Sequence, residues 1–512
     1  MWTPIEIKKI WHLTFEYSGI VKVGGLAEAV RTMTQALANS GLEVLVLMPS
    51  HGVHLNPNRG FDLVPLDFQA CGDRIGIDGN KYHYCIGAEI ARLGNVNVVL
   101  FKGLDTQTGL VFDSRYPYEN IEEKASLFTR AVVAFAEKYG LPDLVHVHDW
   151  HSVLAGVALK DLGERKGVSI PLVYTIHLSS TRCFPWHYAS VDWSGIHDRH
   201  HPVWRTWKHE WFRYSDVWDS VYGCVEAFGV LESDLITTVS HGYLEELLGK
   251  YGYWLREKSC VIYNAVDWRV EDTINWLLRK YNTANRIDTR WRVVDDVDSY
   301  CRDKVGWIEK RGPLFLVIGR LSHQKGIDIA LNALKYTNDF RLIVLGTSVG
   351  DRGYEFYLNS LVEGLPGRAV IYRCTPPLDY LKALYYVSTA TLVPSRWEPF
   401  GIVAVESMSM GTPVIASSTG GLGEIVVDLG VNPQDATGIL VSTGDIAGFA
   451  KAMERLAYLI EIDKESGDKI RNNCIRRVDM LFRSWRIRDM TLSCYEKARL
   501  MAFYRAHAGV YK

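Results

Sequence analysis

The chain has 512 residues, enough for at least two domains that each bury their own core. Hydrophobic residues make up 47% of it and charged residues 23%, as in an ordinary soluble globular protein. The net charge is −2, and no apolar run approaches the roughly 18 residues that span a bilayer, so we expect neither a nucleic-acid partner nor a membrane partner.

The first predicted elements form a βαβ unit. A strand over 9–14 leads into a glycine turn, a helix to about residue 39 and a second strand over 43–49. Gly24 and Gly25 let a backbone approach a phosphate closely, and Lys22 adds positive charge beside them. The full G-x-G-x-x-G spacing is absent, so a dinucleotide site is not indicated. A tight structural turn is the alternative interpretation.

Further strands are predicted over 97–101, 144–147 and 171–177. The second ends in the run 148–151 and the third delivers His177 to the same edge, where open α/β sheets bind ligands. His148, Asp149 and His151 are also residue types that bind metals. Their spacing is not the usual one of a metallohydrolase and no further cluster clearly completes a site, so we predict no metal.

A tryptophan-rich segment covers residues 182–222. Trp204, Trp207, Trp211 and Trp218 have the spacing i, i+3, i+7 and i+14, which predicts a buried helical stripe. An aromatic surface for sugar rings is the alternative. A strand over 233–240 follows, and residues 266–309 show no clear period and are predicted to connect two domains.

A second α/β series begins at residue 313, with strands over 313–319, 341–345, 369–373, 391–394, 414–416 and 437–441. These elements predict an N-terminal domain over 1–305, a C-terminal domain over 306–488, and a helical tail over 489–512 that packs across both. Two similar α/β folds would then face one another, with the active cleft at their interface.

The charged residues of the second half gather at two turns. Arg320 and Lys325 follow the strand over 313–319 and can clamp a diphosphate, although a solvated basic turn is the simpler interpretation. Glu398 and Glu406 bracket the start of a helix predicted over 401–410, whose first N–H groups can bind an anion. Carboxylates beside an anion site suit the hydroxyls of an attached sugar.

Several motifs together resemble those of one family. They are K-x-G-G-L at 22–26, H-D-W-H at 148–151, T-I-H at 175–177, G-R-L-x-x-Q-K-G at 319–326 and E-x7-E at 398–406. In this order the chain resembles the glycogen and starch synthases, and most closely the short archaeal type. The resemblance implies the GT-B architecture, with two Rossmann-like α/β/α domains, and a retaining glucosyltransferase.

The resemblance also implies roles for individual residues. It gives catalytic roles to His177, Arg320, Lys325 and Glu398. Donor and nucleotide binding fall to Lys22, Gly24, Gly25, Tyr372, Cys374, Phe400, Gly401, Ile402 and Glu406. The acceptor side would include Glu28, Asp149 and His151. The chain departs from the family at Glu28, where an aspartate is usual, and over 178–182, where the family has Asn and then Gln-Gly.

The expected substrates are ADP-glucose or UDP-glucose and an α-1,4-glucan, with no cofactor. A same-fold enzyme acting on a small sugar acceptor, of the trehalose- or sucrose-synthase type, stays open. So do a non-catalytic glucan-binding protein, a metallohydrolase and a homo-oligomeric state.

The cysteines and the amino terminus bear on the compartment. Nine scattered cysteines without a C-x-x-C pair predict neither a disulfide framework nor a zinc ribbon. The first residues do not form a signal peptide, so a reducing cytoplasm is expected. Five glutamines are few for this length and hint at a thermophilic source.

Overall fold

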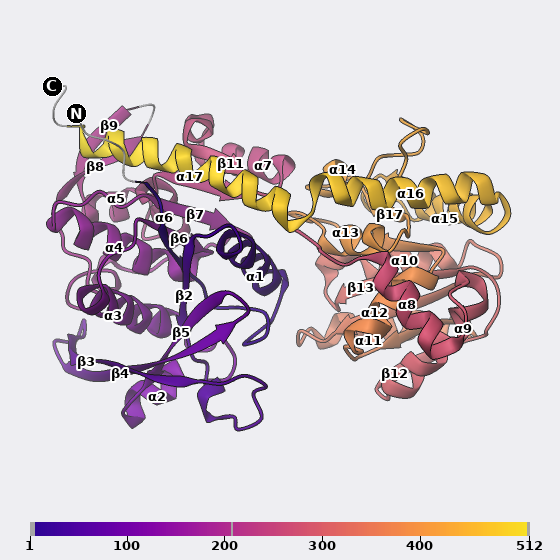
Figure 1. The fold of residues 1–512 in the computed structure, drawn as a ribbon, viewed down its shortest axis with the longest axis horizontal. Coiled ribbons are helices and arrows are strands. Elements are labelled where there is room, and N and C mark those ends of the chain that lie inside the picture. Colours follow the sequence, from indigo (N-terminus) through magenta and orange to yellow (C-terminus); the bar gives the residue numbers. More distant parts are fainter. Residues whose placement is uncertain (1–5, 206–207, 509–512) are drawn as a thin grey trace. The chain divides into compact units, whose positions relative to one another are not determined.

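The computed structural model describes residues 6–205 and 208–508, which form two compact units (Figure 1). Unit 1 comprises Met1–Val239, Leu244–Ile262 and Ile487–Lys512, and unit 2 comprises Ser240–Tyr243 and Tyr263–Arg486. Residues 263–305, which the sequence prediction assigned to the first domain, therefore pack in unit 2.

Unit 1 is built on a nine-stranded sheet in the order β11-β10-β7-β6-β1-β2-β5-β4-β3. The strands from β11 to β5 pair in parallel, and β4 pairs antiparallel with both β5 and β3. The strands are β1 (Lys9–Leu13), β2 (Glu43–Pro49), β3 (Val64–Ile75), β4 (Lys81–Leu93), β5 (Val96–Gly103), β6 (Leu144–His148), β7 (Leu172–Ile176), β10 (Leu235–Thr238) and β11 (Ser259–Val261). The central strands β1, β6 and β7 are almost wholly buried, as expected of parallel strands covered on both faces.

Helices of unit 1 pack on this sheet and on one another (Figure 1). They are α1 (Gly25–Ala38), α2 (Thr106–Phe112), α3 (Ile121–Tyr139), α4 (Val153–Arg165), α5 (Tyr214–Ser220), α6 (Val225–Glu232), α7 (His241–Tyr251) and α17 (Ser484–Ala506). Helix α1 is amphipathic, as expected of a helix at the surface of a sheet. Its apolar residues recur every three or four positions and are buried, whereas its other face meets solvent.

Unit 2 is built on a seven-stranded sheet in the order β12-β15-β14-β13-β16-β17-β18, parallel except for β12. Its strands are β12 (Lys304–Ile308), β13 (Leu314–Arg320), β14 (Arg341–Thr347), β15 (Arg368–Tyr372), β16 (Ala390–Val393), β17 (Val414–Ser417) and β18 (Gly438–Val441). Its helices are α8 (Val270–Tyr281), α9 (Arg286–Tyr300), α10 (Ile327–Leu334), α11 (Arg352–Glu363), α12 (Leu378–Val387), α13 (Ile402–Ser409), α14 (Leu422–Ile425), α15 (Ile446–Ala457) and α16 (Lys464–Leu481).

Both sheets reverse their strand order at one point. In unit 1 the chain moves outward from β1 through β2 and then returns to add β6 on the other side of β1. In unit 2 it moves from β13 through β14 and β15 and then adds β16 beside β13. Because the loops diverge there, the carboxyl ends of β1 and β6, and of β13 and β16, are where such sheets bind ligands.

Two sequence predictions about local structure are wrong. The helical stripe of tryptophans is instead a hairpin of β8 (His200–Arg205) and β9 (Lys208–Arg213), in which Trp204 lies opposite His209. Trp211 is exposed, Trp218 is buried in α5, and Trp207 lies outside the described residues. The supposed connection over 266–309 contains α8, α9 and β12, because its apolar residues do recur at helical spacing.

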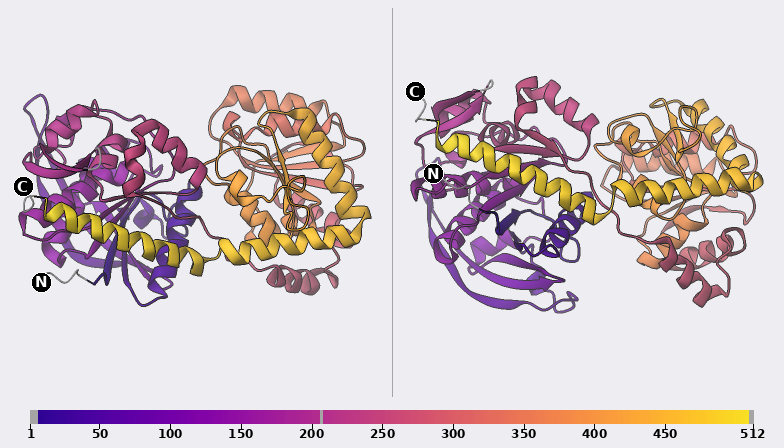
Figure 2. Two further views of the ribbon diagram at one scale, coloured as in Figure 1. Left: turned by 90° about the horizontal axis from the view of Figure 1, so that it is seen from above. Right: turned by 45° about the horizontal axis from the view of Figure 1, so that its top comes forward.

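The C-terminal helix α17 lies along unit 1 (Figure 2). From Ile487 onward the hydrogen bonds described for this helix that leave the tail reach unit 1, including those of Tyr495 and of the buried Arg505, which pairs with Asp234. These contacts fix the tail on one unit. Within the described residues, no helix has both the length and the apolar character that crossing a bilayer requires.

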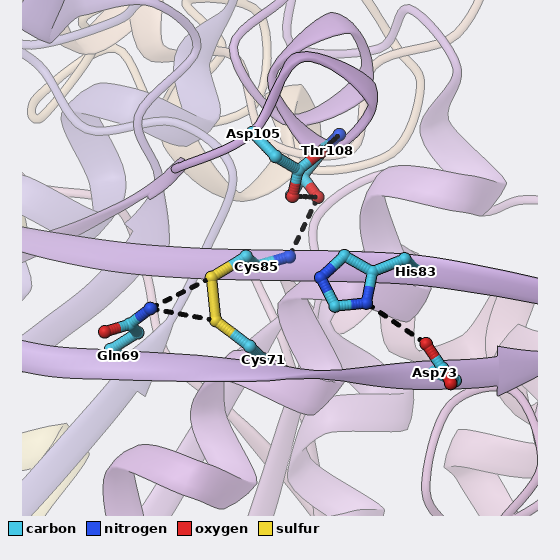
Figure 3. The surroundings of a disulfide bond; sticks show 7 residues. All are labelled: Gln69, Cys71, Asp73, His83, Cys85, Asp105 and Thr108. Atoms are coloured by element: carbon cyan, nitrogen blue, oxygen red, sulfur yellow. Dashed lines mark hydrogen bonds and ion pairs between the residues drawn. A yellow bond between two sulfur atoms is a disulfide. The ribbon is translucent and has the colours of Figure 1, made fainter.

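The prediction that the cysteines form no disulfide framework is wrong. Three disulfides join Cys71 to Cys85, Cys260 to Cys494 and Cys301 to Cys374. The first links directly opposite residues of β3 and β4, and the amide of Gln69 lies against both of its sulfurs (Figure 3). The partners are 14, 234 and 73 residues apart, so no spacing in the sequence marks them as pairs.

Candidate active site

A pocket in unit 2 lies where the strand order reverses, at the carboxyl ends of β13 and β16 and the first turn of α13. Its lining residues are Val317, Ile318, Lys325, Leu392, Val393, Pro394, Ser395, Glu398, Gly401, Ile402 and Val403. The pocket therefore combines a cation, a carboxylate and the start of a helix, whose first N–H groups favour an anion.

Lys325 and Glu398 form an ion pair at this pocket. Lys325 Nζ donates to Glu398 Oε2 at 2.6 Å, and Ser395 Oγ donates to the same oxygen at 3.0 Å. An ammonium carries three N–H donors, so Lys325 can hold Glu398 and still donate to a phosphate. The sequence prediction that these two residues share one site is consistent with this geometry.

The two loops that carry these residues are fastened together. Arg396 makes two bonds to the carboxylate of Asp328, at 2.9 and 2.7 Å, and its backbone N–H donates to Gln324 O. Gly326 has φ +62°, and a Cβ there would lie 2.0 Å from Pro394 O, so only glycine lets the loops approach this closely. The positions of Lys325 and Glu398 thus follow from the fold around them.

The remaining predicted residues of unit 2 have different surroundings. Arg320 ends β13 and bonds the side chain of Gln324 at 3.2 Å; within the described chain no carboxylate lies at ion-pair distance from it. Glu406 is not among the pocket-lining residues and accepts a hydrogen bond from Tyr385. Buried Phe400 packs on the rings of Tyr263 and Phe482.

The predicted nucleotide-base loop ends β15. The ring of Tyr372 is buried and its hydroxyl donates to Asp298; burial first, and then this hydrogen bond, raise the pKa of Tyr372. The sulfur of Cys374 is bonded to Cys301. Both side chains are therefore engaged in the fold, and contact with a base would fall to the backbone, as the resemblance implies.

In unit 1 the glycine turn after β1 is organised by Glu16, a residue that the sequence analysis did not single out. Its buried carboxylate accepts the backbone N–H groups of Val23 at 2.6 Å and Gly24 at 2.9 Å, and the hydroxyl of Tyr118. The N–H of Gly24, which was expected to face a phosphate, is thus bonded within the turn. Lys22 Nζ lies 2.7 Å from Glu28 Oε1 in a largely exposed pair.

The two glycines of this turn are not required by the fold. Neither Gly24 nor Gly25 has a positive φ, and a Cβ built on either would meet no atom within 4 Å. The fold leaves room for a side chain at both positions. Glycine there leaves the backbone open to close approach by a ligand.

Asp149 and His177 lie together at the ends of β6 and β7. Asp149 Oδ1 accepts the backbone N–H groups of His177 at 2.7 Å and Leu178 at 3.1 Å. Burial raises the pKa of Asp149 to about 8, and its backbone has φ 58° and ψ 167°, a conformation that non-glycine residues rarely adopt. Asp149 therefore holds the start of the segment that follows His177.

His151 is also buried beside this turn. Its ring packs against Phe15, with centroids 4.6 Å apart, and against Tyr118, and burial lowers its pKa to about 3. Neither ring nitrogen has a hydrogen-bond partner among the described residues. Buried polar atoms of this kind are usually bonded, so the two ring nitrogens of His151 are candidates for a hydrogen bond to a ligand.

A chain of hydrogen bonds between buried histidines leads to His177. His148 Nδ1 lies 3.1 Å from His177 Nε2, and His148 Nε2 lies 3.0 Å from His12 Nδ1. The hydroxyl of Tyr495, from α17, lies 3.3 Å from His12 Nε2 and 2.9 Å from His146 Nδ1. Burial lowers the pKa of each of these histidines, and neutral rings in a row fix one another's tautomers.

His12, His146 and His148 are also close enough to share a metal ion, with ligand nitrogens within 4.8 Å of one another. Each of their six ring nitrogens has a hydrogen-bond partner, however, so a cation would have to displace several of these bonds. The set that the sequence analysis considered for a metallohydrolase, His148, Asp149 and His151, is not the one that the fold gathers.

Tyr495→Phe is expected to lower the free energy of unfolding by about 1–3 kcal/mol, because it leaves nitrogens of His12 and His146 buried without this partner. Urea denaturation measures the loss. The matched control is Tyr504→Phe on the same helix, where the ring is 56% exposed. Equal stability of the two variants would show that the tyrosine hydroxyl contributes nothing to the chain of histidines.

The chain resembles known proteins over both of its units. A family model described as the starch synthase catalytic domain matches residues 9–257, and one described as glycosyl transferases group 1 matches residues 302–475. Glycogen synthase of Thermotoga maritima is 26% identical, over 91% of this chain and 94% of that protein. Glycogen synthase of Thermus thermophilus is 29% identical, over 82% of this chain and 87% of that protein.

The fold has close counterparts among solved structures. The catalytic domain of starch synthase IV from Arabidopsis thaliana, bound to ADP and acarbose, superposes with a TM-score of 0.75 at 20% identity, and the match covers 97% of this chain and 99% of that one. This confirms the predicted GT-B fold class, with two Rossmann-like α/β units.

Proposed function

Because the chain belongs to the glycogen and starch synthase family, we propose that it is a retaining glucosyltransferase that moves glucose from ADP-glucose or UDP-glucose to the non-reducing end of an α-1,4-glucan. The observation that carries the proposal is the unit 2 pocket, where Lys325, Glu398 and the first turn of α13 line one space. This combination suits a sugar joined to a diphosphate. No metal and no cofactor are part of the proposal.

Lys325 and Arg320 are assigned to the diphosphate. The bond between glucose C1 and the β-phosphate oxygen breaks, a glycosidic bond forms to the acceptor hydroxyl, and the proton of that hydroxyl passes to the departing phosphate. Negative charge grows on the diphosphate during this step, and fixed cations stabilise it. Glu398 would accept hydrogen bonds from donor hydroxyls, and Glu406 from the ribose.

The residues of unit 1 are assigned to the sugars. His177 contacts the donor near its reacting carbon, and Asp149 serves it by fixing the backbone of residues 177 and 178. His151 accepts a hydrogen bond from the acceptor. The turn at Gly24 and Gly25 gives the donor phosphates close access to the backbone, with Lys22 and Glu28 beside it.

The test is nucleotide release from ADP-glucose and from UDP-glucose, with and without glycogen, in the presence of EDTA. Release that depends on glycogen and survives chelation supports the proposal and identifies the donor. Release that needs a small sugar such as glucose or fructose instead would favour the small-acceptor alternative, to which the altered segment 178–182 also points. No nucleotide release with any donor and acceptor would overturn both the proposed glucan synthase and the small-acceptor alternative.

Gly25→Ala is expected to raise KM for the nucleotide sugar by at least about tenfold, which corresponds to about 1.4 kcal/mol of lost binding. The added methyl group meets no atom of the protein, so the folded chain should be as stable as before. Steady-state kinetics and urea denaturation measure the two effects separately.

The matched control is Gly249→Ala in α7, where a Cβ also meets nothing within 4 Å. It should leave KM unchanged and, because alanine favours a helix more than glycine does, should not lower stability and can raise it by up to about 1 kcal/mol. An unchanged KM in Gly25→Ala would remove the close approach at this turn from the proposed function.

A further inference from the structure

Two thiols outside the three disulfides lie opposite one another in unit 1. Cys183 and Cys224 form an isolated antiparallel bridge between the segment after β7 and the start of α6. Both are free cysteines. Nothing in the proposed transfer reaction uses either of them.

The backbone bonds around this bridge define its type. Phe184 N donates to Gly223 O at 3.1 Å, and Val225 N donates to Arg182 O at 3.0 Å. These bonds flank the cysteines rather than join them, so the two residues are a non-hydrogen-bonded pair. Opposed Cα atoms in such pairs are about 4.5 Å apart, which lies within the range of about 4.4–6.8 Å that disulfides span.

The same chain already contains a disulfide of this arrangement. Cys71 and Cys85 are directly opposed across the antiparallel strands β3 and β4, with their Cα atoms 4.0 Å apart, and their sulfurs are bonded (Figure 3). The backbone of the bridge at Cys183 and Cys224 thus has a counterpart that accommodates the bond.

The two thiols differ in access, and both differ from the third free cysteine. Cys183 is exposed, Cys224 is half-buried, and Cys474 is buried. Burial and the neighbouring Cys224 raise the pKa of the Cys183 thiol, whereas burial raises that of Cys474 to about 12. A reagent in solution should therefore reach Cys183 first and Cys474 last, and should react faster as the pH rises.

We propose that Cys183 and Cys224 form a reversible disulfide by exchange with a small disulfide such as oxidised glutathione. The Cys183 thiolate attacks one sulfur of oxidised glutathione and releases one glutathione thiol. The Cys224 thiolate then attacks the Cys183 sulfur of the mixed disulfide and releases the second. The protein loses two electrons and two thiol protons, and glutathione is reduced by the same amount.

A disulfide between Cys183 and Cys224 would add a covalent restraint to residues 178–183, the segment that follows His177. Residues 178–183 begin at Leu178, whose N–H donates to Asp149 Oδ1. The carboxylate of Glu226 in α6 accepts hydrogen bonds from Ser179 Oγ at 2.7 Å and from Ser180 N at 2.5 Å. A disulfide at Cys183 would fasten the far end of this segment to the residue just before α6. The segment after His177 would then be fixed covalently as well as by hydrogen bonds.

The test is thiol mapping on the full folded chain. Protein reduced with a mild thiol is incubated at increasing ratios of oxidised to reduced glutathione, trapped with iodoacetamide, digested and analysed by mass spectrometry. The expected result is a peptide that links Cys183 to Cys224, formed with a loss of two reactive thiols and reversed by dithiothreitol. A final product that carries glutathione on Cys183, or two thiols that stay alkylatable at every ratio, would overturn the proposal.

Three variants make the test specific. In Cys224→Ser the exchange should stop at glutathione on Cys183, and in Cys183→Ser the linked peptide should not form. Cys474→Ser should form the linked peptide as the natural chain does. Formation of any other new pair in the natural chain, such as Cys183 to Cys474, would also overturn the assignment.

Discussion

Lys325→Ala is expected to lower kcat for glucan extension by about 100- to 1000-fold, the loss that follows when one fixed group that stabilises transition-state charge is removed. The ammonium is the cation that lines the unit 2 pocket, and its loss also leaves Glu398 without a counter-charge there. A donor diphosphate would then meet the Glu398 carboxylate with only Arg320 of the two assigned cations left to offset it. The effect should therefore appear in kcat and in KM for the donor.

Arg320→Ala should act in the same direction, since its guanidinium is held only by Gln324 and by no carboxylate in the described part of the chain. The matched control is Lys335→Ala, at an exposed lysine just after α10 that bonds the side chain of Asn332. Steady-state rates with glycogen and the preferred donor measure all three variants. Near-normal activity of Lys325→Ala would remove the diphosphate clamp from the proposal.

Acid is expected to destabilise the protein strongly, by a net of about 4 kcal/mol between pH 7 and pH 5.5. Five buried histidines and the half-buried His177 have pKa values lowered chiefly by burial; the five are His12, His51, His146, His148 and His151. In the unfolded chain each takes up a proton near pH 6.5. In the folded chain the pKa of His12, His151 and His177 is lowered to about 3, and that of the other three is also lowered well below its usual value.

The sign follows from proton counts. Below pH 6.5 the unfolded state binds more protons, so each of these histidines makes folding less favourable by about 1 kcal/mol at pH 5.5 relative to pH 7. Asp149 acts in the opposite direction. Its pKa of about 8 means that the folded state holds a proton that the unfolded state has released. Between pH 7 and pH 5.5 this stabilises the folded state by about 2 kcal/mol and offsets part of the loss caused by the histidines.

Urea denaturation at pH 7, 6 and 5.5 measures the effect, which is large against a typical total stability of about 5–15 kcal/mol. Asp149→Asn keeps an oxygen for the N–H groups of His177 and Leu178 but does not titrate. Its stability should therefore fall more steeply with acid than that of the natural chain. A denaturation midpoint that is unchanged between pH 7 and 5.5 would mean that these histidines are charged in the folded state.

The sequence predicted most of both sheets because short apolar runs that end at glycine or polar turns are typical of buried parallel strands. It also brought Lys325 and Glu398 to one site, since each follows a strand at the point where the sheet order reverses. These features depend on residues close together in the chain. Local pattern is sufficient to find them.

Other features had a signal that was misinterpreted. In α8 the residues Val270, Ile274, Leu277 and Tyr281 recur at helical spacing, so the helix could have been predicted despite its charged neighbours. The tryptophans near Trp204 follow the same spacing, yet Pro202 lies just before them and the segment turns back after Arg205. Because the first turn of a helix tolerates proline, Pro202 alone does not exclude a helix there, and the pairing of β8 with β9 is what shows that none forms.

The rest of the site could not be read from the sequence. The contact between Tyr495 and His12 joins residues 483 positions apart, and the disulfide of Cys260 and Cys494 spans 234. Glu16 bonds the glycine turn seven and eight residues away, but a carboxylate at that spacing has many possible partners. Only the folded structure shows which N–H groups bond the carboxylate of Glu16.

The division of the chain has a consequence for its biosynthesis. Unit 2 is almost wholly encoded between residues 263 and 486, whereas unit 1 needs the segment that begins at Ile487. That segment supplies Arg505, whose guanidinium neutralises the buried carboxylate of Asp234, and Cys494. On the ribosome, therefore, the second unit can be complete before helix α17 is made, and the buried carboxylate of Asp234 in unit 1 is paired only after residues 487–506 have emerged.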